Sequence, residues 1–371
     1  MALEVVLTPK TTKIIQKGVL KMRETMKAIY KHSPEPGGLV LQDVPMPSIG
    51  PSQVLVKIKK TAICGTDIHI YNWDAWSQRT IKTPQVIGHE FVGEIVEVGS
   101  QVSRLIVGQL VSGEGHIVCG KCRHCITGHP HLCRATVGIG VNMDGVFSEY
   151  VAYPAENIWV CDKSISEEVL AVQDPLGNAV HTALSYNVLG EDVLITGAGP
   201  IGLMSIPIIK RAGARNIVVT DVNSQRLDMA KELGATMVVN VNKVDLQDAI
   251  ENVKGMNEGF DVGLEMSGSP HAFIDMVDTM ANGGKIAVLG ILPTNTFVDW
   301  NKFIFNSLTL KGIYGRQMYD TWYRMTALLQ SGLESEVAKV ITHRFHYTEY
   351  EKGFELMKEG QTGKVILNWE D

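Results

Sequence analysis

The 371-residue sequence has no long apolar run. No stretch approaches the roughly 18 apolar residues that a transmembrane helix needs, and the amino terminus lacks the apolar core and cleavage site of a secretory signal. Residues 1–26 include several lysines, but acidic residues occur among them, and they lack the serine and arginine richness of an organellar leader. We interpret residues 1–26 as an appended tail and expect a cytoplasmic protein with no membrane partner.

An excess of positive charge is also absent. The formal net charge is −6 and the pI is near 6.0, so no global basic field exists to bind nucleic acid or an anionic membrane. Hydrophobic residues make up 45% and charged residues 20%, which is the balance of a folded globular protein. The length suits two domains of roughly 100–200 residues each.

Cysteine is scarce, with six in the chain, but four of them fall close together. A disulfide-rich secreted scaffold would be shorter and would spread its cysteines, so the cluster indicates metal binding in a reducing compartment. Four thiolates can surround one tetrahedral ion and leave no open position, which predicts a structural zinc site. An iron–sulfur cluster and unpaired buried thiols are the alternatives. The four residues are Cys119, Cys122, Cys125 and Cys133.

The residue pattern changes along the chain. Residues 27–175 contain short β-type runs, such as 54–58, 91–98 and 147–151, broken by glycine and proline, which predicts an antiparallel or barrel-like domain. Residues 176–312 alternate apolar strands with helix-period segments, which predicts a doubly wound parallel sheet. Its expected strands are 192–196, 216–220, 237–240, 261–265 and 286–290. Residues 313–371, with a helix expected near 320–331, are too few to fold alone and should rejoin the first domain or complete the sheet.

A glycine-rich loop follows the first strand of the second domain. Gly197 permits a tight turn, Gly199 lets a pyrophosphate approach the backbone, and Gly202 allows close packing of the next helix on the strand. Asp221 ends the following strand, where a carboxylate can accept hydrogen bonds from the adenosine ribose and repel a 2′-phosphate. Arg226 could accommodate that phosphate, but the acid favours NAD over NADP.

A second candidate metal site is dispersed along the first domain. Cys64 lies in Cys-Gly-Thr-Asp-Ile-His, and His89 and Glu90 lie in Gly-His-Glu. One thiolate, one imidazole and one carboxylate would leave a coordination position for water or an alcohol, as a catalytic zinc requires. Each fragment alone is modest evidence. Together, and upstream of a dinucleotide loop, they predict a zinc-dependent dehydrogenase.

Longer segments make a family resemblance specific. The chain from about Lys27 to its carboxyl end resembles the L-threonine 3-dehydrogenase family of zinc-containing medium-chain alcohol dehydrogenases. The segments that carry the resemblance are Thr61–Trp73, Ser112–His116, Asp174–Thr182, Glu265–Gly268 and Gly312–Arg316. Residues 1–26 lie outside it, and Gly108-Gln109-Leu110-Val111 departs from the usual Gly-Asp-Arg-Val. The resemblance implies a GroES-like β-rich catalytic domain and a Rossmann domain.

The resemblance also implies roles for particular residues. Cys64, His89 and Glu90 would bind the catalytic zinc, Thr66 and His69 would relay a proton, and Asp174 would be a fourth ligand or the partner of the zinc-bound water. It implies two zinc ions per subunit, NAD as cofactor, L-threonine as substrate and a homotetramer. The nucleotide would contact Ile201, Asp221, Arg226, Leu289, Gly290, Ile291, Ile313 and Tyr314. Because of their charges and their positions in the motif segments, Glu114, His116 and Arg316 are candidates for recognising the amino acid.

Other interpretations stay open at this point. A zinc- and NAD-dependent polyol or 2,3-butanediol dehydrogenase would share the metal and nucleotide residues. A zinc-stabilised binding protein without catalysis would need only the four-cysteine loop. Thr66 could be a turn residue, His69 a surface histidine and Asp174 a helix N-cap.

Overall fold

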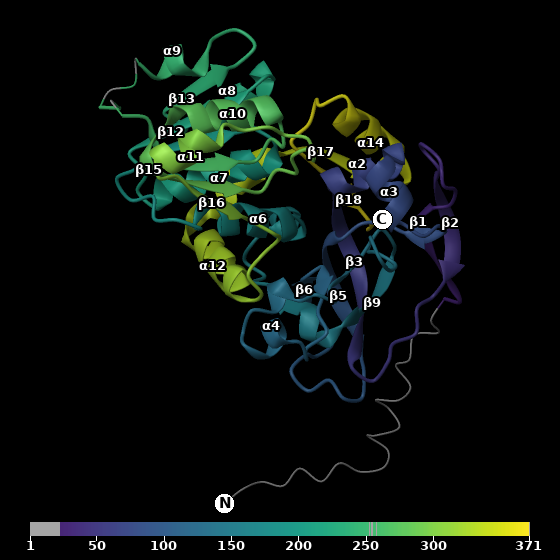
Figure 1. Ribbon diagram of the computed structural model, residues 1–371. Helices are drawn as coiled ribbons and strands as arrows, with labels where there is room; N and C mark the ends of the chain where they lie inside the picture. Colours follow the sequence, from purple (N-terminus) through teal and green to yellow (C-terminus); the bar gives the residue numbers. More distant parts are fainter. Residues whose placement is uncertain (1–22, 252, 254, 257, 371) are drawn as a thin grey trace, which may run out of the picture.

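The computed structural model describes residues 23–370 except residues 252, 254 and 257. Two bodies lie side by side, one built mainly of antiparallel strands and one of a parallel sheet covered by helices (Figure 1). Both expected domain types are therefore confirmed. In the described part of the chain, no helix is long and apolar enough to cross a membrane.

The first body is built on a sheet of order β10-β6-β5-β3-β18-β17, with β9 also paired to β3. Its strand β3 is largely buried: Val54, Val56 and Ile58 are fully buried and pack with Phe91 and Ile95 in one core. Two smaller sheets, β2-β1-β4 and β7-β8, accompany it. Its elements are β1 (Thr25–Lys31), β2 (Leu39–Pro45), β3 (Gln53–Ile63), α2 (Gly65–Asn72), α3 (Ala75–Thr80), β4 (Gln85–Val86), β5 (Glu90–Val98), β6 (Leu110–Gly113), β7 (His116–Ile117), α4 (Arg123–Ile126), η2 (Pro130–Leu132), β8 (Val137–Gly138), β9 (Tyr150–Pro154), η3 (Ala155–Asn157), β10 (Ile158–Val160) and α5 (Glu167–Ala171).

The second body is a parallel sheet of order β13-β12-β11-β14-β15-β16. Its central strand β11 is buried at every position, as expected where helices cover both faces. The strand order reverses between β11 and β14, and doubly wound folds bind ligands in a crevice at the carboxyl ends of the strands at such a point. Its elements are α6 (Gln173–Ala183), β11 (Asp192–Thr196), α7 (Pro200–Arg211), β12 (Asn216–Asp221), α8 (Ser224–Glu232), β13 (Met237–Asn240), α9 (Leu246–Ile250), β14 (Phe260–Glu265), α10 (Pro270–Thr279), β15 (Met280–Val288), α11 (Trp300–Phe305) and β16 (Thr309–Gly312).

The carboxyl-terminal segment belongs to both bodies. Helices α12 and α13 pack on α6 and α7 of the second body, and only from β17 onward does the chain rejoin the first sheet, later than the predicted boundary at residue 313. Strand β18 pairs antiparallel with β3, placing Val365 opposite Ile63. The elements are α12 (Asp320–Leu328), η4 (Leu329–Leu333), α13 (Glu334–Val340), β17 (Ile341–His346), η5 (Tyr347–Glu349), α14 (Tyr350–Lys358) and β18 (Lys364–Asn368).

The expected strands match unevenly. Strands 192–196 and 237–240 have the predicted bounds, and 216–220 and 261–265 are extended by one residue. The last strand begins earlier, at Met280, and the run 147–151 forms its strand only from Tyr150. In that run, Phe147 instead exchanges loop hydrogen bonds with Ile29 and Ile87.

Candidate active site

Cys64 stands at the junction of β3 and α2. It is the N-cap residue of α2 in an extended conformation, and its backbone N–H donates to Asp67 Oδ2 at 2.9 Å. This bond satisfies one of the donors that a helix start leaves free. The chain turn therefore fixes the position of the thiol at the end of a buried strand.

His89 and Glu90 come from the start of β5. Gly88 precedes them with φ +87°, and a Cβ there would lie 2.1 Å from the Phe147 ring, so the tight turn requires glycine. One ligand atom from each of Cys64, His89 and Glu90 lies within 4.8 Å of the others. The structure thus brings together the three residues predicted from separate motifs.

This ligand set fits a zinc ion. Within the described residues, His89 Nδ1 and Glu90 Oε1 are buried without a hydrogen-bond partner, an arrangement that costs free energy unless a ligand or ion satisfies them. Burial alone would lower the pKa of His89. Cys64, Asp67 and Asp174 outweigh this effect and raise the pKa well above its ordinary value. The surroundings are therefore negatively charged and favour a cation.

A buried lysine completes the environment of Glu90. Lys364, from β18, lies 2.5 Å from Glu90 Oε2 and donates to the carbonyl of Ile63 at 2.8 Å. Burial lowers the pKa of Lys364, but Glu90 and Cys64 more than offset this effect and raise it. The lysine is therefore charged and forms an ion pair with Oε2, while Oε1 has neither a hydrogen bond nor an ion pair among the described residues.

Asp174 lies in the first turn of α6 with its carboxylate facing the metal-ligand set. A Cβ on Gly115 would be 3.6 Å from Asp174 Oδ2 and 3.8 Å from His89 Cβ. Arg316 holds that oxygen at 2.7 Å, and among the described residues Asp174 is not part of the compact ligand set. The N-cap of α6 is Val172, which removes the N-cap interpretation of Asp174.

Arg316 also forms a buried pair with Glu114. Its Nε donates to Glu114 Oε2 at 2.8 Å and its second amino group to Oε1 at 2.5 Å, while the Trp322 indole donates to Oε2 at 2.9 Å. Burial raises the pKa of Glu114, but Arg316 holds it well below its ordinary value. Because their charges neutralise each other out of solvent, Glu114 and Arg316 are poor candidates for direct recognition of an amino acid. His116 binds Glu114 Oε1 through Nδ1 and is partly exposed, so it stays a candidate.

Thr66 and His69 lie three residues apart on α2, and therefore on one face of the helix. Thr66 Oγ1 is 3.8 Å from Cys64 Sγ, and the His69 side chain is 60% exposed. The two side chains thus run from the metal-ligand set toward solvent.

The glycine loop has the geometry that a dinucleotide needs. Gly197 has φ +93°, and a Cβ on Gly202 would lie 2.0 Å from the Gly197 carbonyl oxygen. A Cβ on Gly199 would meet no described atom within 4 Å, so space is open where a pyrophosphate would approach at the start of α7. Asp221 Oδ2 accepts from Ala198 N at 2.7 Å, which places the carboxylate against this loop.

The other predicted nucleotide contacts surround the same crevice. Leu289, Gly290 and Ile291 follow β15, and Ile313 and Tyr314 follow β16. Ile291 and Tyr314 are exposed and so are accessible to a nucleotide, while Ile313 is buried and Ile201 is half-buried. In the described chain, Arg226 Nε is buried without a hydrogen-bond partner, and a Cβ on Gly360 would lie 3.8 Å from a terminal amino group of Arg226.

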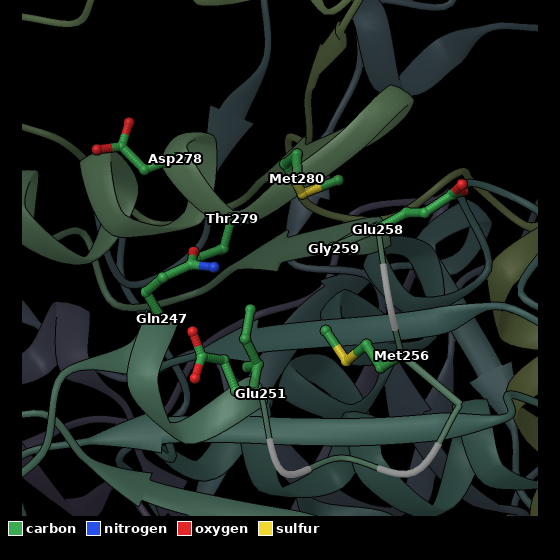
Figure 2. Close-up of a pocket in the computed structure, with 9 residues that line it drawn as sticks. Gln247, Glu251, Met256, Glu258, Gly259, Asp278, Thr279 and Met280 are labelled. Atoms are coloured by element: carbon green, nitrogen blue, oxygen red, sulfur yellow. The ribbon is translucent and has the colours of Figure 1, made fainter.

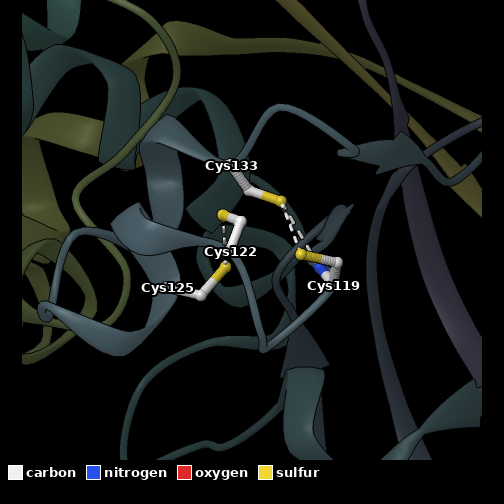
Figure 3. Close-up of side chains that lie close together, drawn as sticks. All are labelled: Cys119, Cys122, Cys125 and Cys133. Atoms are coloured by element: carbon white, nitrogen blue, oxygen red, sulfur yellow. Dashed lines mark hydrogen bonds between the residues drawn. The ribbon is translucent and has the colours of Figure 1, made fainter.

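The four cysteines of the surface loop converge around one point (Figure 3). Cys119 and Cys133 have their sulfurs 3.5 Å apart, as do Cys122 and Cys125. Zn–S bonds of about 2.3 Å in a tetrahedron place sulfurs about 3.8 Å apart, so the loop fits a closed zinc site. The backbone N–H groups of Cys119 and Ala135 both point to the Cys133 sulfur at 3.4 Å, which favours the thiolate.

A cavity of about 210 Å³ lies elsewhere, between α9, α10 and the amino ends of β14 and β15 (Figure 2). Gly259 and Met280 line it, together with Gln247 and Glu251. It is at the opposite edge of the sheet from the nucleotide crevice, and it contains none of the predicted site residues.

The comparisons with known proteins agree with this geometry. The family model "Alcohol dehydrogenase GroES-like domain" matches residues 50–163, and the model "Zinc-binding dehydrogenase" matches residues 200–331. Among solved structures, the NADH complex of the rspB alcohol dehydrogenase from Escherichia coli CFT073 has a TM-score of 0.85 at 28% identity, covering 94% of this chain and 100% of that one. The 2R,3R-butanediol dehydrogenase of Bacillus subtilis has a TM-score of 0.82 at 27% identity, covering 93% and 100%. Fold, site and matches define the class as the zinc-binding alcohol dehydrogenases.

A closer relative narrows the class. L-threonine 3-dehydrogenase of Rhizobium etli is 55% identical over 348 residues, which cover 94% of this chain and 100% of the relative. This chain belongs to the L-threonine 3-dehydrogenase family.

Sequence reasoning missed residues that surround the predicted ones. Lys364, which pairs with Glu90, lies in no recognised motif. Asp74, which binds His69, lies just beyond the segment Thr61–Trp73 that carries the resemblance. Glu265 was noted only within a motif, although its Oε1 accepts from the backbone N–H groups of Ser267 and Gly268 and its own carbonyl accepts from Leu289 and Gly290. An acidic residue at the end of a strand beside the crevice could have been predicted to link the neighbouring loops through hydrogen bonds.

Proposed function

We propose that this chain is an NAD-dependent, zinc-dependent dehydrogenase that oxidises L-threonine to L-2-amino-3-oxobutanoate in threonine catabolism. The observation that carries the proposal is the three-residue ligand set of Cys64, His89 and Glu90, which leaves a coordination position open beside a dinucleotide crevice. Family membership at 55% identity selects L-threonine over polyols and 2,3-butanediol as substrate. A binding protein without catalysis would need neither the open ligand set nor the crevice.

When bound, zinc would make the substrate hydroxyl acidic near neutral pH, and NAD⁺ would accept the hydride. The chain must then move the hydroxyl proton from the metal-ligand set to solvent. The Thr66 hydroxyl can both accept and donate a proton, and His69 can exchange one with water because it is exposed. We assign these residues as the proton relay.

Asp174 is proposed to act beside the metal, as partner of the bound water or hydroxyl, and not as a permanent ligand. The ion pair with Arg316 supports this role because it fixes the carboxylate outside the compact ligand set. Arg316 in turn is held by Glu114, so this buried pair serves to position Asp174. Of the three substrate candidates, His116 is the one that stays in the proposal.

NAD is proposed over NADP because Asp221 lies against the glycine loop, where its charge would repel a 2′-phosphate. Two zinc ions per subunit are proposed, one in each ligand set, and a reducing compartment such as the cytoplasm would keep the five cysteine ligands as thiols that can bind them.

A homotetramer is proposed on the basis of an exposed apolar face. The outer strand β16 and helix α11 carry large apolar side chains in solvent, which a second copy could cover. These side chains are Trp300, Ile304 and Phe305 of α11 and Leu310 of β16, and exposed Phe297 lies in the segment just before α11.

A substrate panel tests the proposal. Purified zinc-loaded protein is incubated with NAD⁺ and L-threonine, 2,3-butanediol or sorbitol while NADH absorbance is followed, with Cys64→Ser as the inactive control. L-Threonine should give by far the highest kcat/KM. A higher value for a diol would overturn the substrate assignment, and no NADH from any alcohol would favour the binding protein.

A further inference from the structure

His69 has a fixed carboxylate partner. Asp74 Oδ2 lies 2.6 Å from His69 Nδ1, and the His69 ring also packs edge-on against Trp76 with centroids 6.2 Å apart. The His69 ring is therefore held in one orientation, although its side chain is 60% exposed. An exposed ion pair of this kind stabilises a fold by only about 0–1 kcal/mol, so stability alone does not account for the arrangement.

The Asp74 carboxylate is itself locked by the next helix. Asp74 is the N-cap of α3, and its other oxygen, Oδ1, accepts from Ser77 N at 2.9 Å and from Ser77 Oγ at 3.1 Å. Burial raises the pKa of Asp74, but the hydrogen bonds from Ser77 and His69 lower it below its ordinary value. The carboxylate is therefore ionised and can only accept hydrogen bonds.

This geometry determines the tautomer of His69. Because an ionised carboxylate faces Nδ1, that nitrogen carries the proton, and in the neutral ring Nε2 has the free lone pair. We propose that Asp74 is a positioning residue of the proton relay, which keeps His69 Nε2 as the proton acceptor. The inference rests on the relay role of His69 in the proposed function.

The proton movements balance in each turnover. His69 Nε2 accepts one proton from the relay, the ring becomes an imidazolium, and Asp74 stabilises its charge from the Nδ1 side. The imidazolium then releases the Nε2 proton to water, which restores the same tautomer. Asp74 keeps its charge throughout.

The substitution Asp74→Asn tests this inference because Ser77 dictates how the amide must lie. The two Ser77 donors require the amide oxygen, so the amide nitrogen turns to His69 and donates to Nδ1. Nε2 must then carry the proton and cannot accept one. Asparagine caps a helix about as well as aspartate, so the melting temperature should stay unchanged.

The expected loss in kcat is about 10- to 100-fold, at the low end for an acid–base defect because solvent can partly replace an exposed histidine. KM for NAD⁺ and for L-threonine should change little, the solvent deuterium isotope effect on kcat should rise, and added imidazole should restore part of the rate. Asp74→Ser keeps a capping oxygen but cannot reach His69, so it should show the same pattern. Asp245→Asn, the same change at the N-cap of α9, is the matched control and should leave kcat unchanged.

Comparison with His69→Gln separates the possible failures. If Asp74 acts through His69, the double variant should be no slower than His69→Gln alone. If Asp74→Asn kept the wild-type kcat while His69→Gln was slow, the role of Asp74 would be overturned and the relay would stand. Losses in kcat that multiply in the double variant would likewise overturn the role of Asp74 and leave the relay standing. Wild-type kcat in His69→Gln would instead overturn the relay of the proposed function.

Discussion

Replacing Lys364 with methionine should destabilise the metal-free protein strongly. Lys364 is 2% exposed and faces Glu90, which is fully buried, at 2.5 Å. Removing one partner of a buried ion pair leaves the other charge uncompensated and costs about 3–5 kcal/mol. For a chain of this size, 1 kcal/mol corresponds to roughly 1.3 °C, so the melting temperature should fall by about 4–6 °C.

Zinc should reduce this loss. Without the lysine, Glu90 has the metal as its remaining positive partner, so the ion should stabilise the variant more than the wild type by mass action. Melting curves are recorded by differential scanning fluorimetry with zinc and after chelation. The rise in melting temperature on adding zinc should be larger in Lys364→Met than in the wild type.

Two further variants control for the loss of packing and of the hydrogen bond to Ile63. Lys364→Arg keeps the charge and should lose less stability, and Lys364→Met combined with Glu90→Gln removes both charges and should recover part of the loss in the chelated state. If Lys364→Met melted like the wild type after chelation, or gained no more from zinc, the ion pair would not have the role argued from its geometry.

Three other predictions follow from the site. Cys125→Ser should lower the melting temperature and remove one zinc, while Cys64→Ser should abolish turnover and leave the fold largely intact; equal effects on melting temperature would contradict a division into structural and catalytic sites. Asp221→Ser should narrow the preference for NAD⁺ over NADP⁺ by at least about tenfold in kcat/KM, and a wild type that prefers NADP⁺ would refute that reading. Glu114 has a pKa below its ordinary 4.5, chiefly because Arg316 overcomes the effect of burial, so its stabilising contribution is present above about pH 4.5 and is lost as pH falls through the folded-state pKa. The melting temperature of Glu114→Gln should therefore fall less steeply than that of the wild type between about pH 5 and pH 3, and parallel curves would exclude the contribution.

Local sequence predicted the features that depend on neighbouring residues. The glycines of the nucleotide loop, the strand β11 with its apolar centre Val193–Ile195, and the four-cysteine loop each follow from the chemistry of a short segment. The short β-type runs broken by glycine and proline likewise indicated the β-rich body. These elements need little information from the rest of the chain.

Pairings between distant segments could not be predicted in the same way. Glu114 and Arg316 both lie in recognised motifs, and their opposite charges suited an amino-acid substrate as well as they suited each other. Only the tertiary structure shows that the two charges meet out of solvent, where Trp322 of α12 also donates to Glu114 and Arg316 also donates to the Asp174 carbonyl of α6. A charged side chain in a motif therefore indicates importance, but it does not show whether the side chain contacts the substrate or positions another side chain.

Lys364 extends this argument to the metal site itself. It donates to Ile63, which is 301 residues away in the sequence, because β18 pairs with β3 beside Cys64. The charge balance of the predicted zinc ligands thus depends on strand β18, which follows the whole parallel-sheet body in the sequence. The first body cannot complete its metal site from residues 27–175 alone, and any fragment that ends before β18 would lack both the sheet partner of β3 and the cation that neutralises Glu90.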